Sequence, residues 1–128
     1  ASTQDKHIYV KGGIIRTNPE KKNITLIFSG HEYADGYETF LSTLTKHGIS
    51  ASFFFTGDFY RNTAYKSLIQ NLKDKGHYLG AHSDQHLLYC AWEKRDSLLV
   101  DKTTVWQDLK ANYAEMSKFG IKPADAPY

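Results

Sequence analysis

Residues 76–86 read GHYLGAHSDQH, and this stretch decides the fold class of the chain. The run from His77 to Ala81 is short, mostly apolar and preceded by a glycine, which predicts a buried β-strand. His82 and His86 follow where that strand would leave the sheet. Two imidazoles four positions apart can bind one divalent ion, either on one face of a helical turn or from a loop. Because the chain contains six histidines, such a pair also arises by chance, and the surrounding sequence decides what it means.

The alternation of a strand with an amphipathic helix occurs three times from residue 24 onward. The predicted strands are 24–28, 51–55 and 77–81. The predicted helices run from about Tyr37 to Lys46, from a cap at Asn62 to about Lys75, and from about Lys94 to Phe119. Repeated βα units need parallel strands joined by right-handed crossovers. The sequence therefore predicts an α/β fold made of parallel βα repeats.

The third predicted helix is the longest, and we expect its apolar residues to face the sheet. These residues are Leu99, Trp106, Leu109, Tyr113 and Met116. Gly120, followed by Pro123, marks the end of this helix.

Residues 1–23 precede the repeats and are expected to form an N-terminal extension. Within them, Ile8-Tyr9-Val10 and Gly13-Ile14-Ile15 flank Lys11-Gly12, which predicts a small hairpin that closes one end of the domain. Residues 24–128 form the rest of the predicted organisation, and one domain is the default for a chain of 128 residues.

Composition argues against several classes of function. Lys and Arg number 16 against 14 Asp and Glu, and no basic run is longer than Lys21-Lys22, so nucleic acid and anionic membranes are not predicted partners. No apolar stretch approaches the ~20 residues that span a bilayer. Cys90 is the single cysteine, so no disulfide can form within these residues, and we expect it to pack as a small hydrophobic side chain.

The loops that follow the three strands carry most of the chemically reactive side chains. Parallel strands bring such loops to one edge of the sheet, where α/β enzymes build their sites. We therefore expect His31, Asp58 and His82 to converge there, with turn formation as the alternative role of Asp58. His47 and His77 fall at the other end of the sheet and are expected to be structural.

The loop 29–36 contains three candidate ligands or bases, His31, Glu32 and Asp35. The histidine pair and one side chain of this loop would supply three protein ligands and leave an open position. Water bound there would fall in pKa from ~15.7 towards ~7. Glu32 or Asp35 would accept the proton as water attacks a carbonyl carbon.

Several neighbouring side chains have two interpretations. Asp35 is as well placed to cap the helix that begins near Tyr37 as to act as a base. Asp84 and Gln85 lie between the two histidines and are candidates for orienting them. Three aromatic residues near the loops are candidates for stacking on sugar rings or for plain packing: Tyr33, Tyr89 and Trp92.

The chain resembles the polysaccharide deacetylase (NodB homology) family, carbohydrate esterase family four. The resemblance rests on the strand 24–28, the segment from Lys46 to Phe55, the segment from Gly76 to Ser83, and His86. The resemblance covers residues 24 to about 128, and His82, Ser83 and His86 reproduce the family's His-Ser/Thr-x-x-His motif. It implies the N-terminal part of a distorted (β/α) barrel. It also implies a divalent metal held by an Asp and the two histidines, and hydrolysis of N-acetyl or O-acetyl groups on sugar polymers.

The same resemblance implies the cofactor, the partner and the location. The expected metal is zinc, with nickel, cobalt or manganese as alternatives. The expected partner is an acetylated glycan. Export from the cytoplasm follows from the polymeric substrates of the family.

The chain departs from the family pattern at two motifs. Where the family has Thr-Phe-Asp-Asp, this sequence has Ile27-Phe28-Ser29-Gly30, so the aspartates used as base and as ligand are absent from the aligned positions. We expect His31 to take the ligand position, with Glu32 or Asp35 as the base. The third motif, Arg-x-Pro-Tyr/Phe, lacks its Arg at 124–128, and we expect a further segment or a second chain to complete the barrel.

Two functions follow from these features. The first is a metal-dependent deacetylase of a polysaccharide or peptidoglycan-like glycan. The alternative is a catalytically inactive relative that keeps the groove and binds glycan, which the missing Asp-Asp pair favours. A flavodoxin-like domain would need a glycine-rich phosphate loop after the first strand, and residues 29–32 are too acidic for that role.

Overall fold

The computed structural model describes residues 7–126. Residues 1–6 of the expected extension, and Pro127 and Tyr128 of the expected third motif, lie outside the described residues. The elements in chain order are β1 (Ile8–Val10), β2 (Gly13–Arg16), β3 (Ile27–Gly30), α1 (Tyr37–Lys46), β4 (Ser52–Phe55), α2 (Gly57–Arg61), the 3₁₀ helix η1 (Thr63–Tyr65), α3 (Lys66–Asp74), β5 (Tyr78–Ala81) and α4 (Lys102–Ser117).

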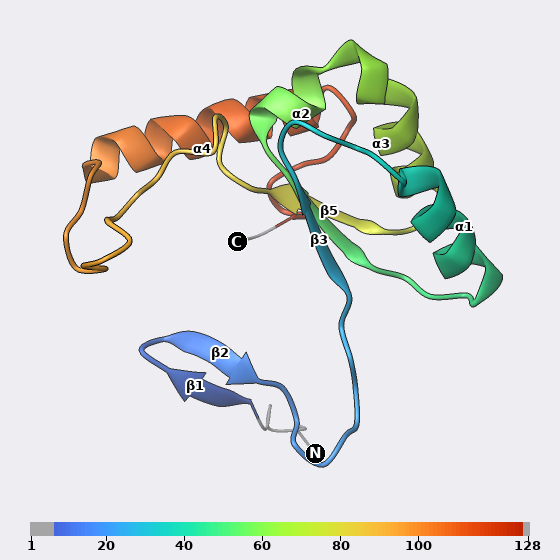
Figure 1. Cartoon of the computed structure of the whole chain (residues 1–128), viewed down its shortest axis with the longest axis horizontal. Coiled ribbons are helices and arrows are strands. Elements are labelled where there is room, and N and C mark those ends of the chain that lie inside the picture. Colours follow the sequence, from blue (N-terminus) through green and yellow to red (C-terminus); the bar gives the residue numbers. More distant parts are fainter. Residues whose placement is uncertain (1–6, 127–128) are drawn as a thin grey trace.

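The sheet that positions the loops has the strand order β3-β4-β5, and both pairings are parallel. In its register Gly30 lies opposite Phe55, and Phe55 lies opposite Ala81. All three strands therefore end at the same level, and the helices α1, α3 and α4 run alongside them (Figure 1). The predicted parallel βα repeats are confirmed.

The first strand differs from its prediction in bounds and in burial. β3 begins at Ile27, three residues later than expected, and Ile24 and Ile27 are exposed. Among the described residues β3 pairs only with β4, so it is an edge strand with one unpaired side. An apolar run identifies a strand but not its place in the sheet, which is why the burial was predicted wrongly.

Aromatic rings form the core on the helix-covered face of the sheet. Phe53 is 1% exposed, and its ring centroid lies 5.0 Å from that of Phe28 and 6.0 Å from that of Phe40 in α1. Successive strand residues point to opposite faces, so Phe54 packs against Tyr78 on the other face and is only half-buried. The alternation in the strand thus separates a core ring from a surface ring.

The helix α1 is confirmed, with Leu41 and Leu44 buried against the core. It begins after Gly36, whose φ of 72° lies in the left-handed region that glycine adopts without strain. No side chain caps its first turn, so the predicted capping role of Asp35 is wrong.

A short helix, α2, occupies residues predicted to be a loop. Its N-cap is Thr56, whose hydroxyl accepts a hydrogen bond from the Phe59 amide at 3.1 Å. The predicted cap at Asn62 is confirmed, since its side chain accepts a hydrogen bond from Ala64 N at 3.0 Å. The helix that it caps is η1, which leads into α3. A helix of one turn has too few residues for apolar periodicity to reveal it.

The helix α4 is shorter than predicted, and its predicted apolar stripe is confirmed only in part: Met116 is buried and Tyr113 packs against the core. It begins at Lys102, where Asp101 caps it by accepting from Thr104 N at 2.7 Å. Trp106, part of the predicted apolar stripe, is exposed. The buried positions follow a helical spacing of four and are Asp108, Asn112 and Met116. The rest of the stripe was predicted wrongly because two polar residues, Asp108 and Asn112, occupy the inward face beside Met116.

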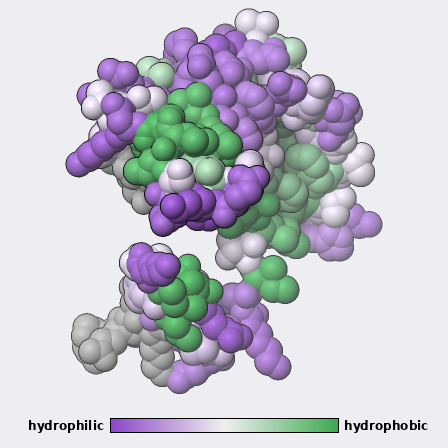
Figure 2. Space-filling view, turned by 60° about the vertical axis from the view of Figure 1, so that its left-hand side comes forward, coloured by the Kyte–Doolittle hydropathy of each residue, from purple (hydrophilic) through white to green (hydrophobic). Residues whose placement is uncertain are grey.

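The predicted hairpin is present as β1 and β2, joined by Lys11 and Gly12, both with positive φ. All residues of both strands are exposed. The hairpin lies apart from the three-stranded sheet (Figure 1), so it does not close an end of the domain as expected. Figure 2 shows hydrophobic surface on this separate lobe, where Ile8, Val10 and Ile14 are exposed.

We predict that Phe53→Ala lowers the free energy of unfolding by about 3–5 kcal/mol, because it removes a fully buried ring that its neighbours cannot replace. Urea denaturation measures the change. Phe54→Ala is the matched control on the opposite face and should cost less. Equal losses in the two variants would contradict the assignment of the core to the face of Phe53.

The stability should also depend on the protonation of His77. Its Nδ1 accepts from Ala51 N at 3.1 Å, and burial, followed by the charge of Lys75, lowers its pKa. Below the unfolded value of ~6.5, the unfolded chain takes up a proton that the folded chain does not, so the free energy of unfolding falls as the pH is lowered. His77→Asn keeps an acceptor without titrating, and urea unfolding at about pH 7.5 and about pH 5.5 should show a shallower fall for it. The same slope in both proteins would rule this cause out.

Candidate metal and catalytic centre

The carboxyl edge of the sheet brings together the residues that follow each strand. Thr56 N donates to Gly30 O at 3.1 Å, and His82 N donates to Phe55 O at 3.1 Å, so the strand pairing continues one residue into each loop. His31, Thr56 and His82 therefore leave neighbouring strands at one level. The predicted convergence of His31 and His82 is present in the structure.

Three imidazoles gather at this edge. The ring centroids of His31 and His86 are 5.0 Å apart with the rings nearly parallel, and those of His82 and His86 are 5.3 Å apart. His31 Nδ1 lies 3.1 Å from the Thr56 hydroxyl, which leaves Nε2 as the ring nitrogen of His31 that is free to bind an ion. The cluster thus combines one residue from the first loop with two from the third.

The surroundings of His82 favour its uncharged imidazole. Burial lowers the pKa of His82, and the neighbouring His86 and His31 lower it further, since a second positive charge nearby is unfavourable. A metal-binding histidine has to be neutral. The donor types therefore fit a divalent ion such as zinc. As the side chains stand, no three His, Cys, Asp or Glu residues within 7–126 are arranged to hold one.

Two predicted bases, Glu32 and Asp35, and a third carboxylate, Asp58, follow the strands at this edge. Glu32 Oε1 is 3.8 Å from His31 Nε2, and its side chain is exposed. Asp35 is exposed in the same loop. Asp58 bonds to Arg61 in the first turn of α2, so it is engaged in an ion pair. Of these three carboxylates, Glu32 has a contact with the imidazole cluster.

Gly30, at the position where the family resemblance calls for an aspartate, has no room for a side chain. A Cβ atom there would lie 2.9 Å from the ring of Phe55 and 3.2 Å from the ring of Phe59. Real Cβ atoms essentially never come this close to another atom, so one of the two rings would have to shift. The packing of this chain is therefore built around a glycine at this position.

The loop that carries the two histidines is irregular rather than helical. Ser83 and His86 both have positive φ, 65° and 58°, a conformation that residues other than glycine rarely adopt. The Ser83 hydroxyl accepts a hydrogen bond from Leu87 N at 3.1 Å, which joins the two ends of this turn. The histidines meet through this turn and not through the face of a helix.

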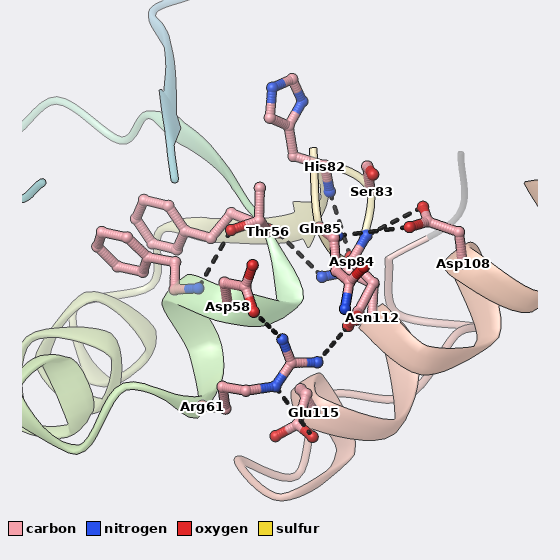
Figure 3. Close-up of polar contacts among 12 residues, drawn as sticks. Thr56, Asp58, Arg61, His82, Ser83, Asp84, Gln85, Asp108, Asn112 and Glu115 are labelled. Atoms are coloured by element: carbon pink, nitrogen blue, oxygen red, sulfur yellow. Dashed lines mark hydrogen bonds and ion pairs between the residues drawn. The ribbon is translucent and has the colours of Figure 1, made fainter. Parts of the chain in front are cut away.

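An ion pair between the buried Asp84 and the partly exposed Arg61 anchors the same loop to α2. Asp84 is 6% exposed and accepts from Arg61 Nη2 at 2.5 Å, while Arg61 also bonds to Asp58 and lies 3.7 Å from Glu115 of α4 (Figure 3). Burial by itself lowers the pKa of Arg61, but Asp84 and Asp58 outweigh it and raise that pKa. A Cβ at Gly57 would lie 1.7 Å from the Asp84 carboxylate, so the anchor requires glycine there.

Two buried polar residues of α4 meet the loop from the other side. Asp108 accepts from Asp84 N at 3.0 Å, and Asn112 accepts from His82 N at 3.2 Å (Figure 3). Burial raises the pKa of Asp108, but hydrogen bonds from Tyr89 and from the backbone of Asp84 outweigh it, and the pKa lies below its ordinary value. Sequence reasoning missed both residues. Their spacing of four, continued by Met116, is the signal that could have found them.

The remaining candidates have structural partners. Tyr89 donates to Asp108 Oδ2 at 2.8 Å, and Cys90 is half-buried with its Sγ 3.8 Å from Arg95 Nη1. Trp92 is exposed, and the Arg95 guanidinium lies 4.2 Å above its ring centroid. Tyr33 is 75% exposed in the first loop.

Within residues 7–126, no helix has the length and apolar composition needed to cross a bilayer.

Comparison with known proteins gives consistent matches. The polysaccharide deacetylase family model matches residues 16–124. The chain is 37% identical over 70 residues to the peptidoglycan-N-acetylmuramic acid deacetylase PdaA of Bacillus subtilis (strain 168), covering 54% of this chain and 26% of that protein. It is 34% identical over 76 residues to an uncharacterised 30.6 kDa protein of Geobacillus stearothermophilus, covering 59% of this chain and 28% of that protein. Each match spans little more than a quarter of the relative.

Solved structures agree with the predicted fold. A family 4 carbohydrate esterase from Bacillus anthracis has a TM-score of 0.67 at 30% identity, covering 82% of this chain and 46% of that chain. A family 4 acetyl xylan esterase from Clostridium thermocellum, solved with a cobalt ion, has a TM-score of 0.55 at 20% identity, covering 77% and 46%. The chain therefore has the fold of part of a (β/α) barrel and spans under half of these structures.

We predict that Arg61→Met lowers the free energy of unfolding by about 1–3 kcal/mol, because it leaves the buried carboxylate of Asp84 without its cation. Thermal and urea unfolding measure the loss. Lys118→Met removes another cation that pairs with Glu115, but that lysine is 65% exposed, so it should cost under about 1 kcal/mol. A loss in Arg61→Met no larger than in Lys118→Met would show that the ion pair with Asp84 adds no stability.

Proposed function

The chain belongs to the polysaccharide deacetylase family, and from this premise we propose that it removes acetyl groups from a polysaccharide or peptidoglycan-like glycan with the help of a bound divalent metal ion. The observation that carries the proposal is the meeting of His82 and His86 with His31 at the carboxyl edge of the parallel sheet. This edge is where α/β folds place their reactive groups. The relative with a stated activity, PdaA, is named as a deacetylase of peptidoglycan.

In this proposal His82 and His86 hold the ion through neutral ring nitrogens, and His31 adds Nε2 as the third ligand. A divalent ion in such a site supplies a water of lowered pKa and polarises the acetyl carbonyl. The Thr56 hydroxyl, 3.1 Å from Nδ1, holds the ring of His31 in one orientation. Zinc suits three imidazoles, with nickel, cobalt or manganese as alternatives.

The proposed base is Glu32, with Asp35 as the second candidate in the same loop. A carboxylate takes a proton from water as the water oxygen bonds to the acetyl carbon. The bond from that carbon to the sugar nitrogen or oxygen then breaks as the proton passes to that leaving atom. The products are acetate and a free amine or hydroxyl. Glu32 is favoured because Oε1 lies 3.8 Å from His31 Nε2, beside the proposed ion.

A second candidate function is glycan binding without catalysis. The observation that favours it is Gly30, whose surroundings exclude the aspartate that the family resemblance calls for. With Ser29 and Gly30 in place of both aspartates of the family motif, the third ligand and the base have to come from the following residues of the loop. If those residues act neither as ligand nor as base, the site is left with the histidine pair alone.

The proposal includes a location and a partner. Acetylated glycans of the cell wall or of plant polysaccharides are too large to enter a cell, so we place the protein outside the cytoplasm. The glycan is the expected partner. A further segment that completes the barrel remains part of the proposal, because the chain spans under half of the solved relatives.

The test is metal binding and acetate release by the protein. We expect zinc to bind, and an N-acetylated glycan oligomer or a chromogenic acetyl ester to release acetate. His82→Ala and His86→Ala should lose both the ion and the activity. Glu32→Gln should keep the ion and lose about 10²–10⁴-fold in rate if it is the base, and Asp35→Asn tests the other candidate.

His47→Ala is the matched control, because His47 is the exposed C-cap of α1 at the other end of the sheet. It should change neither measurement. Glycan binding without acetate release at any metal concentration would overturn the enzyme and support the second candidate. Full activity in both Glu32→Gln and Asp35→Asn would place the base elsewhere.

A further inference from the structure

We propose that Asp108 and Asn112 of α4 are positioning residues for the histidine loop, holding the backbone between His82 and His86 so that the two imidazoles stay at the edge of the sheet. The inference rests on the proposed function, in which these histidines bind a metal ion. It adds to that site two residues that lie more than twenty positions away in the sequence and bond to the backbone of the loop.

Asp108 acts as an acceptor for the middle of the loop. It is 7% exposed, and its two oxygens accept from Asp84 N at 3.0 Å, from Gln85 N at 3.4 Å and from the Tyr89 hydroxyl at 2.8 Å. The two amides belong to the residues that separate the histidines. An ionised carboxylate only accepts hydrogen bonds, so it satisfies all three donors at once.

Asn112 joins the loop to the strand beside it. It is 0% exposed, its Oδ1 accepts from His82 N at 3.2 Å, and its Nδ2 donates to Phe55 O at 3.2 Å. One amide group therefore bonds to both β4 and the residue after β5. Only a side chain with both a donor and an acceptor can do this, so neither Asp nor Leu would replace it.

The cost of this arrangement argues for a role beyond packing. Met116 occupies the next inward position of α4 and is fully buried as an ordinary apolar residue. Burying a carboxylate and an amide is unfavourable unless every polar atom is bonded, whereas an apolar side chain would fill the same face without that condition. Among the buried positions of α4, the two polar residues, Asp108 and Asn112, are the ones that bond to the histidine loop.

The loop itself needs external support. Its positive φ values at Ser83 and His86 are strained, and such strain persists only where the surroundings impose it. On the side of α2, the carbonyls of Ser83 and Asp84 accept from Gly57 N at 3.1 Å and from Asp58 N at 3.0 Å. Together with Asp108, these contacts bond the backbone of the loop on both sides.

The experiment uses two isosteric variants and one control. Asp108→Asn places an NH₂ group against backbone N–H donors, and Asn112→Asp places an oxygen against the Phe55 carbonyl. Met116→Ala loosens the same helix face without touching the loop. Amide hydrogen exchange at Asp84 and Gln85 reports the loop, and calorimetric titration with zinc chloride alone reports the histidines.

We expect Asp108→Asn to speed exchange of both amides at least tenfold and to weaken zinc binding at least tenfold. Asn112→Asp should speed exchange at His82 and weaken zinc binding similarly. Met116→Ala should lower the melting temperature as much or more, and leave zinc affinity within a factor of about two.

Unchanged exchange at Asp84 and Gln85 in Asp108→Asn overturns the positioning role, as does an equal loss of zinc affinity in Met116→Ala at matched stability. If the unaltered protein takes up no zinc, the proposed metal dependence fails. The exchange measurement then still decides whether α4 holds the loop, so the two failures are distinguishable.

Discussion

The parallel register of β3, β4 and β5 is the constraint on which the candidate site depends. Because Gly30, Phe55 and Ala81 lie opposite one another, the residues that follow them leave the sheet side by side. A register shift of one residue would turn each following side chain to the other face. The stacked rings around Phe53 hold this register from the helix side of the sheet.

Backbone hydrogen bonds, more than side-chain packing, shape the histidine loop. The loop receives N–H donors from α2 and gives its own N–H groups to a carboxylate of α4. Arg61 then joins both helices through Asp84 and Glu115. A strained turn between the two histidines can persist only with bonds of this kind, and the same bonds explain why polar groups are buried beside an aromatic core.

The chain belongs to the family but departs from its first motif at Ser29-Gly30. The family match covers most of the chain, yet the ring of Phe55 fills the space in which a side chain at position 30 would lie. The replacement of the aspartate by Gly30 is therefore not an isolated change, because the neighbouring core rings pack around the glycine. In the proposed function the roles of the missing aspartates fall to His31 and Glu32, which lie at the same edge of the sheet.

The sequence by itself determined the βα repeats, the histidine pair and the family, because apolar periodicity and a short motif are local properties. Helix α1 and the cap at Asn62 follow the same local rules. Only the tertiary structure decided that β3 is an edge strand, that Asp35 caps nothing and that α4 turns Asp108 inward. The physical reason is that burial and hydrogen-bond partners depend on segments distant in the chain, and a polar residue on a core face is favourable only once the loop that it bonds has been placed.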